Sequence, residues 1–519
     1  MAKETIEQNY EATSDDEGCC VSVREISQET RAMMMNASFE SLKGVMVLKI
    51  EGSPYQMGFQ HGYLLVDRIE TMATKTLLAL PAYIATLAGI SFEESMERAL
   101  EGQRAAESCL PHECREEMQG IVDGAQSAGF ANITLEKILL WNTYYDQWCL
   151  YSHPHNWESD EKEKRKQSGF NAIFSSGSAG GCSSFTAWNK AAGGDGKLIF
   201  GKNEDNFGMP YQGENRVMIV AKPSHGHGHV FMAYPGLIGL DGGLNEAGFE
   251  MMTQLNSMVD ETMAGCGIAV FTRLLLAHAS TVEDAIQIFQ NHQRCGGIGY
   301  HVADAKAKQA AVIETSSTRI CIRYPKTGAE MLWQSNHSNC YPGWEGYQGY
   351  NMVKDQQLVH ELEDTTTIGA WQRSLRDPDN YWVQAPSRFE RYRTLLQDEY
   401  YGNITPENAI AILSDRVDPY SENNRERGKH EASVSNNILC TICALYPDMT
   451  FEAPEPLGNF QARISNMWSM VAYPATGDFW LAIQGFPAQY GGYEYFNLHQ
   501  LLADKHDSKR PASVLQSRI

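Results

Sequence analysis

The chain has 519 residues, 43% of them hydrophobic and 10% aromatic, which is enough apolar material for one large or two ordinary globular cores. Its formal net charge of −22 leaves no basic surface for a phosphate backbone, so we expect no nucleic-acid partner. The most apolar stretch, residues 76–92, is short for a bilayer span and contains Pro81, so we expect no membrane partner either.

The beginning of the chain predicts a solvated tail. Residues 1–44 include an acidic polar run and contain no basic segment leading into an apolar one, so they do not resemble a secretory signal. Twelve cysteines without such a signal indicate reduced thiols and a cytoplasmic protein. Cys440 and Cys443 form a C-x-x-C pair without a second pair, which we interpret as core packing. We therefore expect no metal and no cofactor.

The next segment, residues 45–151, is predicted to be α-rich. Ser91 and Glu94 have the spacing of a capping box, and Thr134 precedes apolar residues at helical spacing. Residues 152–181 then combine a charged run with the small-residue stretch SSGSAGG. Neither part can bury enough apolar surface to offset its ordering entropy, so this segment is predicted to be an exposed loop.

The remaining residues, 182–519, are predicted to form a mixed α+β catalytic region. Two strand-like runs flank the turn at Asp195 and Gly196, which predicts a β-hairpin that brings Lys202 and Asp205 back towards Cys182. Helices are expected to begin after Thr281 and Thr405. A cation beside Cys182 would lower the pKa of its thiol and favour the nucleophilic thiolate. An isolated cysteine, in contrast, is more often a packed core residue.

Five segments resemble the motifs of a known family in the same order. They are GCSSF (181–185), FGKNED (200–205), GLNEAGF (243–249), the Asn-His pair 336–337 and PSRFERYRTL (386–395). They are similar to the isopenicillin-N acyltransferase-like (acyl-coenzyme A:6-aminopenicillanic acid acyltransferase-like) peptidases and to choloylglycine hydrolases, which are N-terminal-nucleophile hydrolases. The resemblance implies an αββα four-layer sandwich preceded by a pro-segment, and a precursor that is cleaved between Gly181 and Cys182.

The resemblance also assigns roles to residues. Cys182 matches the nucleophile, Asp205 the carboxylate that orients its free amine, and Arg388 the arginine beside the nucleophile. Asn245 and Asn336 match the asparagines that stabilise the oxyanion, although turn chemistry would also explain Asn245. Lys202 stands where related enzymes often have arginine, and a point charge does not replace a planar guanidinium.

Elementary chemistry is consistent with these roles. Cleavage would give Cys182 an α-amine with a reference pKa of about 8, close enough to neutrality to accept the thiol proton. Asparagine amides donate hydrogen bonds without carrying charge, which suits an oxyanion. No G-x-S-x-G motif is present, and the sequence around Cys182 is not that of a papain-like protease.

The sequence therefore predicts a self-processing amidohydrolase or acyltransferase that forms an acyl-thioester on Cys182. Its expected partners are a small-molecule N-acyl substrate and its own N-terminal fragment, and the residues leave open whether it forms a homo-oligomer. The alternative is a non-catalytic, unprocessed binding protein of the same fold.

Overall fold

The computed structural model describes most of the chain in several segments. These are residues 27–88, 90–152, 182–207, 209–256, 261–336, 339, 357–361, 384–417, 441–443, 449–451, 457–462 and 464–503. Gly181 and the predicted loop from residue 153 onwards lie outside them, as do Cys440 and His337.

The larger of two main sheets has ten strands. Their order across the sheet is β1 (Ser38–Leu42), β2 (Val45–Gly52), β5 (Val217–Pro223), β6 (His229–Ala233), β7 (Gly242–Asn245), β8 (Phe249–Leu255), β9 (Ile298–Asp304), β10 (Gln309–Thr315), β11 (Ile320–Tyr324) and β13 (Gln357–Glu361). Neighbours are antiparallel except for β2 with β5 and β11 with β13. Every residue of β9 is buried, as expected for a strand covered on both faces.

The second sheet has six strands, and its strand β3 directly follows the predicted nucleophile, Cys182. Its order is β12 (Met331–Gln334), β3 (Ser183–Ala187), β4 (Ile199–Phe207), β16 (Ile464–Tyr473), β17 (Asp478–Ala482) and β18 (Glu494–Asn497). β3 and β4 are antiparallel, with Ser183 opposite Asn203, so the predicted hairpin is confirmed. The short helix α12 (Asn189–Ala192) lies in its connection, and β14 (Met449–Phe451) pairs with β15 (Phe460–Ala462) in a separate ribbon.

A buried histidine connects the two sheets. His301 of β9 has its Nδ1 2.9 Å from Ser184 Oγ and its Nε2 3.1 Å from Thr186 Oγ1, both in β3. Burial lowers the pKa of His301 well below its usual value, so the ring is neutral and one nitrogen can accept while the other donates. These bonds fix β3, which follows Cys182, against the ten-stranded sheet.

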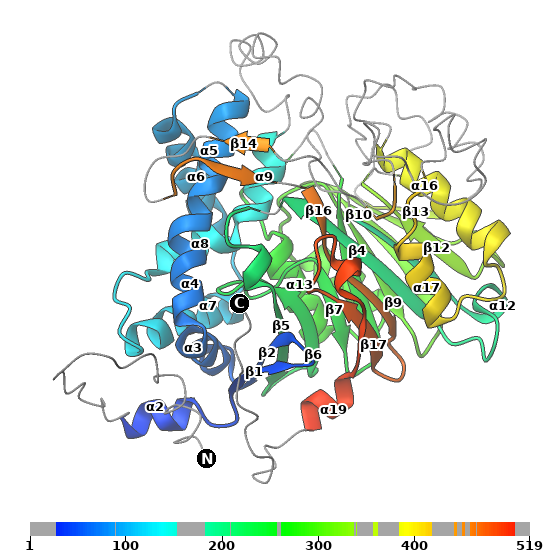
Figure 1. The fold of residues 1–519 in the computed structure, drawn as a ribbon, viewed down its shortest axis with the longest axis horizontal. Helices are drawn as coiled ribbons and strands as arrows, with labels where there is room; N and C mark the ends of the chain where they lie inside the picture. Colours follow the sequence, from blue (N-terminus) through cyan, green and yellow to red (C-terminus); the bar gives the residue numbers. More distant parts are fainter. Residues whose placement is uncertain are drawn as a thin grey trace.

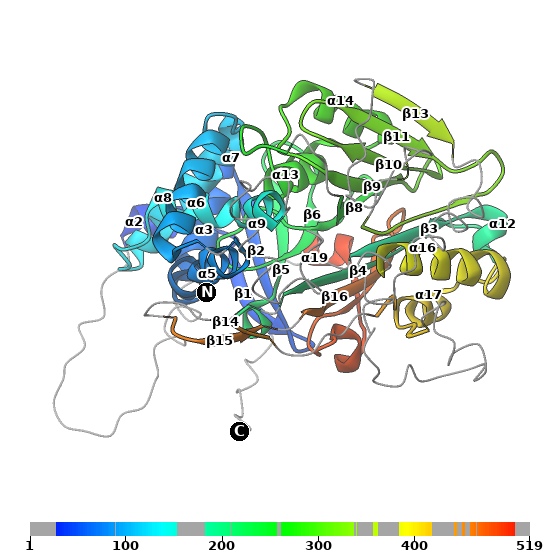
Figure 2. The same cartoon turned by 90° about the horizontal axis from the view of Figure 1, so that it is seen from above.

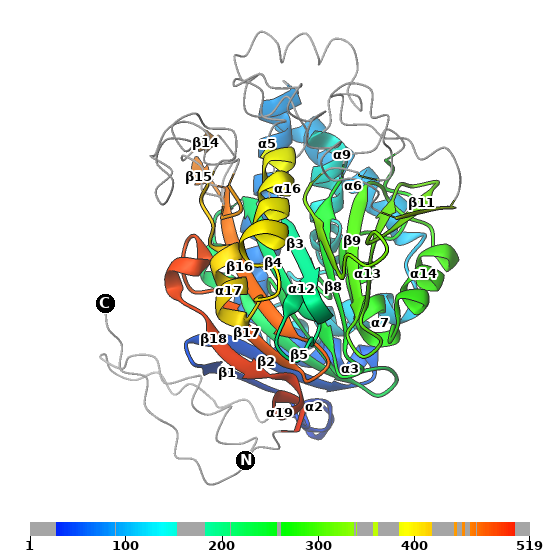
Figure 3. The same cartoon turned by 90° about the vertical axis from the view of Figure 1, so that its right-hand side faces the viewer.

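Helices lie on the outer sides of the sheets (Figures 1, 2 and 3). On the side of the larger sheet are α13 (Ile268–His278) and α14 (Val282–Asn291), and on the side of the smaller sheet are α16 (Gln384–Thr394), the π-helical turn η6 (Leu395–Glu399) and α17 (Pro406–Leu413). Short helical segments elsewhere are η4 (Gly213–Asn215), η8 (Ala488–Gly491) and α19 (Leu498–Ala503). Thr281 and Thr405 cap α14 and α17 as predicted, and the Thr281–Asp284 capping box is complete.

The N-terminal segment forms a helical cluster at one end of the sheets (Figure 1). It comprises α3 (Pro54–Leu64), α4 (Val66–Thr71), the π-helical turn η2 (Met72–Thr76), α5 (Leu77–Ala88), α6 (Phe92–Glu107), α7 (His112–Ser127), α8 (Leu135–Asn142) and α9 (Tyr144–Ser152). Ser91 and Thr134 cap α6 and α8 as predicted. A buried ion pair of 2.7 Å joins Glu117 of α7 to Arg273 of α13 and so ties this cluster to the sheet layers.

Helix and strand are present before the predicted boundary at residue 45. Residues expected in the tail form α2 (Gln28–Met33) and β1, and β2 pairs with β5 in parallel. The N-terminal segment thus contributes the edge strand β1 and its neighbour β2 to the larger sheet, as well as helices.

One cysteine of the described segments is oxidised. Cys321 is disulfide-bonded, so the expectation of fully reduced thiols is wrong there, whereas six other cysteines of these segments, Cys182 included, are not disulfide-bonded.

Among the helices in these segments, none is both long enough and apolar enough to cross a membrane.

Candidate active site around Cys182

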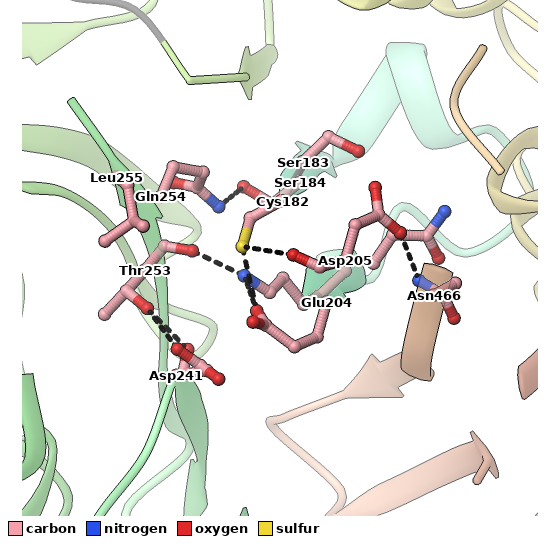
Figure 4. A network of polar contacts seen from close by, with 12 residues as sticks. Cys182, Ser183, Ser184, Glu204, Asp205, Asp241, Thr253, Gln254, Leu255 and Asn466 are labelled. Atoms are coloured by element: carbon pink, nitrogen blue, oxygen red, sulfur yellow. Dashed lines mark hydrogen bonds and ion pairs between the residues drawn. The ribbon is translucent and has the colours of Figure 1, made fainter. Parts of the chain in front are cut away.

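Cys182 lies directly before β3 and is buried, with 3% of its surface exposed. Its thiol contacts the neighbouring strand β4: Sγ lies 3.0 Å from Glu204 Oε2 and 3.9 Å from the backbone oxygen of Asp205. Figure 4 shows the Glu204 carboxylate turned towards the sulfur, while the Asp205 carboxylate points away from it towards Asn466. The thiol therefore donates its hydrogen bond to Glu204, a residue that our sequence analysis did not single out.

Lys202 shares this side of β4 with Glu204, because side chains two positions apart in a strand face the same way. Its Nζ forms a fully buried ion pair of 3.0 Å with Glu204 Oε2 and donates a hydrogen bond to the carbonyl of Thr253 in β8. Asp241, just before β7, receives a hydrogen bond of 3.3 Å from the Thr253 hydroxyl. Burial, and then the charge of Glu204, raise the pKa of Asp241 well above its usual value, which favours the protonated form of this carboxyl.

The thiol itself is not activated in the uncut chain. Burial is the main cause that raises the pKa of Cys182 well above the ordinary cysteine value, and the charge of Glu204 adds to it. Lys202 acts in the opposite direction but does not outweigh them. The predicted effect of Lys202 on the thiol is therefore present, but burial, which disfavours the thiolate, outweighs it.

Asp205 occupies the other face of β4. Its Oδ1 accepts a hydrogen bond of 2.9 Å from Asn466 Nδ2 in β16. Its Oδ2 is buried and has no hydrogen-bond partner among the described residues. Burial raises the pKa of Asp205 to about 7, although the nearby Arg388 acts to lower it. Within the described residues, one oxygen of this carboxyl group is thus left open to a further donor.

Arg388 of α16 connects two of the predicted residues. Its Nη1 donates to the backbone oxygen of Cys182 at 2.8 Å, and its Nη2 donates to Asn336 Oδ1 at 2.9 Å. The guanidinium is fully buried. Because the two donors of a planar guanidinium have a fixed geometry, Arg388 holds the backbone of Cys182 and the amide of Asn336 in one arrangement.

The amide of Asn336 is held from the other side by β8. Its Nδ2 donates to the carbonyl of Leu255 at 3.0 Å, which leaves the second hydrogen of this amide for another acceptor. The residue after Leu255 is Asn256, which is 1% exposed and whose Nδ2 and Oδ1 both lack a hydrogen-bond partner within the described segments. A Cβ atom at Gly299 of β9 would lie only 2.8 Å from Asn256 Nδ2, so the glycine leaves room for this amide.

A buried asparagine amide without a partner is costly, and such groups call for an explanation. Asn256 is adjacent to the residue that anchors Asn336, so we assign it to the candidate site. Sequence reasoning missed Asn256, because nothing local in the sequence separates it from a turn asparagine.

Asn245 is placed differently. Its Nδ2 donates to the carbonyls of Leu276 and Ala279 at 2.9 and 2.8 Å, at the C-terminal end of α13. Its Oδ1 accepts from the backbone amides of Ala247 and Phe249, both at 3.1 Å, in the turn between β7 and β8. Both amide hydrogens are in use, so in this conformation Asn245 caps a helix and a turn and has none left for an oxyanion. Within the described segments, no contact joins it to Cys182.

The described residues contain no group of three or more His, Cys, Asp or Glu side chains that could hold a metal ion. The candidate site therefore consists of a thiol, three carboxyl groups, two cations and amide groups. This set can transfer protons, and it can stabilise an anion once one forms.

Several known proteins resemble this chain. An uncharacterized protein of Archaeoglobus fulgidus is 27% identical over 389 residues, which cover 71% of this chain and 58% of that protein. A penicillin V acylase from Agrobacterium tumefaciens matches 62% of this chain and 87% of its own at 12% identity and a TM-score of 0.34. The Caenorhabditis elegans ortholog of N-acylethanolamine-hydrolyzing acid amidase matches 57% of this chain and 93% of its own, at 14% identity and a TM-score of 0.33.

A family model described as acyl-coenzyme A:6-aminopenicillanic acid acyl-transferase matches residues 191–461, just over half of the chain. The matched range includes Lys202, Asp205, Asn336 and Arg388 and begins nine residues after Cys182. This agrees with the family that the five sequence motifs indicated. The chain belongs to the acyl-coenzyme A:6-aminopenicillanic acid acyl-transferase family.

Proposed function

We propose that the chain is a self-processing cysteine N-terminal-nucleophile enzyme. It cleaves itself between Gly181 and Cys182, and the freed Cys182 then attacks the carbonyl carbon of a small N-acyl substrate. The acyl group is held as a thioester on Sγ while the amine leaves, and water or a second amine resolves the thioester. The products are a free acid in the first case and a new amide in the second.

The observation that carries this proposal is the bridge made by Arg388. A buried guanidinium that binds the backbone of Cys182 and the amide of Asn336 costs much to desolvate and is compensated only by good geometry. It fixes the start of β3, where a new chain end would form. A purely structural cysteine does not need its backbone held in this way.

Asp205 supports the second step. After cleavage, the α-amine of Cys182 has to be oriented to act as the base for its own thiol. The Oδ2 of Asp205 is buried without a partner among the described residues, so it offers an acceptor, and an ammonium group bound by it would compensate the buried carboxylate. One residue would then supply both the nucleophile and the base.

Two amides support the stabilisation of an oxyanion. Within the described part of the chain, the second Nδ2 hydrogen of Asn336 and both hydrogens of Asn256 have no acceptor. Preorganised amide donors of this kind stabilise a tetrahedral intermediate because they do not have to reorganise during the reaction. We propose Asn336 and Asn256 for this role, since the hydrogens of Asn245 are already donated.

The fold fits the same proposal. From one side of the molecule to the other, the layers are helices, a sheet, a second sheet and helices again. This order supports the proposed αββα four-layer sandwich, in which residues 182–519 would form the catalytic part. The segment before residue 152 would act as a pro-segment that stays bound after cleavage, because it shares strands β1 and β2 with the larger sheet.

The test is a panel of N-acyl amides with a chromogenic leaving amine, assayed with wild type and Cys182→Ala. The proposal requires amine release by wild type only. With increasing concentrations of a second amine, the ratio of new amide to free acid should rise in proportion if both products come from one thioester. Free acid without any new amide would narrow the function to hydrolysis.

The alternative is a binding protein of the same fold that never cleaves itself. The two functions separate on a denaturing gel. An uncut 58.0 kDa chain that releases no amine from any substrate of the panel would favour the binding protein.

A further inference from the structure

We infer that Glu204 is the base that removes the proton from the Cys182 thiol during self-cleavage. This inference rests on the proposed function, since it concerns self-cleavage, the first reaction that the chain carries out. In the uncut chain the nitrogen of Cys182 is a peptide amide and cannot serve as a base. The α-amine that serves the mature enzyme does not yet exist, so the first reaction needs a different proton acceptor.

Glu204 has the geometry for this step. Its Oε2 lies 3.0 Å from Sγ, within hydrogen-bond reach of the proton, and both groups are buried. The other carboxylate of the strand, Asp205, is turned to the opposite face and bonded to Asn466 (Figure 4). In the described part of the site, only Glu204 places a carboxylate oxygen on the sulfur.

Lys202 makes the proton transfer electrostatically feasible. Its Nζ lies 3.0 Å from the same Oε2, and its charge also acts on the sulfur. When the proton moves from sulfur to Glu204, the negative charge moves from one neighbour of this cation to another. The buried site therefore keeps one positive and one negative charge before and after the step, which limits the desolvation cost.

The titratable groups around Glu204 are less suited than Glu204 to accept the proton of the Cys182 thiol. The titratable groups that act on it are Lys202 and Asp205 of its own strand, Cys182 before β3, Asp241 before β7, Tyr234 after β6 and Tyr145 of α9. Burial, and then the charge of Glu204, raise the pKa of Asp241 and so favour its protonated form. Burial likewise raises the pKa of both tyrosines, so they stay neutral.

Self-cleavage would proceed through a thioester between Gly181 and Cys182. Glu204 takes the Sγ proton, and Sγ bonds to the carbonyl carbon of Gly181. The bond from this carbon to the nitrogen of Cys182 breaks, and Glu204 passes the proton to that nitrogen, which becomes the α-amine. Water then hydrolyses the thioester, which gives a carboxyl group on Gly181 and restores the thiol. Once the amine exists it can take over as the base.

The experiment follows cleavage of the full chain after a pulse of cell-free synthesis at neutral pH. Glu204→Gln should slow cleavage by about 10²- to 10⁴-fold, the usual contribution of a general base. Glu204→Asp keeps a carboxylate and should be cleaved more slowly than wild type but faster than Glu204→Gln.

The matched control is Glu250→Gln. Glu250 is also buried, and burial raises the pKa of its carboxyl, which favours the neutral form that an amide resembles. This control should be cleaved at the wild-type rate, and near-ultraviolet circular dichroism should show that each variant is folded. If Glu204→Gln does not fold, Glu204→Asp decides, and cleavage of that variant at the wild-type rate would overturn the inference.

The outcomes separate the two claims. If wild type is cut and Glu204→Gln is cut equally fast, Glu204 is not the base, while self-processing stands. If wild type is never cut, self-processing is wrong, and the inference about Glu204 is overturned with it.

Discussion

Arg388 and Asn336 are 52 positions apart in the sequence, yet the Nη2 of the arginine donates a 2.9 Å hydrogen bond to the amide oxygen of the asparagine. The same guanidinium binds the backbone oxygen of Cys182. This bridge joins α16, the segment after β12 and the start of β3, and it gives the first prediction.

Arg388→Lys should lower kcat/KM by about 10- to 100-fold, because an ammonium group cannot hold both acceptors and hydrogen bonds of charged groups contribute about 1.5–3 kcal/mol. The measurement is steady-state amine release. Arg393→Lys in the same helix is the matched control: this arginine pairs with Glu390 and Asp398 and should be replaceable without loss of rate. Equal kinetics for both variants would show that the bridge has no part in catalysis.

Asn256 and Asn245 should respond in opposite ways. Asn256→Ala removes amide hydrogens that are free for an oxyanion and should lower kcat by about 10²- to 10³-fold with little change in thermal stability. Asn245→Ala removes four hydrogen bonds, three of them buried, and should mainly lower the melting temperature. Kinetics and thermal melts of both variants decide between them. A stable Asn245→Ala enzyme with a large loss of kcat would return the oxyanion role to Asn245.

Asp205 should make stability depend on pH. Burial raises the pKa of its carboxyl from 3.8 to about 7, so between these values the folded chain holds a proton that the unfolded chain has released. The stability contributed by this group is therefore present below pH 3.8 and is lost as the pH rises through 7.

Asp205→Asn lacks this ionisation, so its melting temperature relative to that of Asp205 should rise between pH 5 and pH 8. Both proteins should carry Cys182→Ala so that the chain stays uncut. A difference in melting temperature that does not change with pH would contradict the raised pKa.

The Glu117–Arg273 ion pair should hold the N-terminal segment on the sheet layers. Removing one partner of a buried pair leaves an uncompensated charge, so Glu117→Ala should cost about 3–5 kcal/mol of unfolding free energy. Arg98→Ala breaks a more exposed pair within α6 and should cost less than about 1 kcal/mol. Denaturant unfolding measures both values. In the processed enzyme, size-exclusion chromatography should show the two fragments separating more readily in Glu117→Ala than in Arg98→Ala.

The local features of the fold could be read from the sequence. Helix starts at Ser91 and Thr281 depend on side chains that bond amides only three residues away, and the β3–β4 hairpin depends on a turn between adjacent strands. Such signals need no knowledge of distant parts of the chain. The sequence did not predict that residues 38–52 pair at the edge of the larger sheet, because strand partners far apart in the chain are chosen by the whole sheet.

The site was only partly predictable for a related reason. Alternation along β4 places Lys202 and Glu204 on one face and Asp205 on the other, and this two-residue period was available in the sequence. Applying it would have separated Lys202 from Asp205. The raised pKa of the Cys182 thiol and the unpartnered amide of Asn256 could not be found in this way, since both follow from burial by several distant strands.

The most direct test of the account is mass spectrometry of the purified protein, quenched with acid during turnover of an active N-acyl substrate. The account predicts two fragments of about 20 and about 38 kDa from the 58.0 kDa chain, with the larger one beginning at Cys182 and carrying the acyl group on that residue. Cys182→Ala should remain a single chain without an adduct. An active enzyme that stays uncut, or turnover without any acyl group on Cys182, would contradict the account.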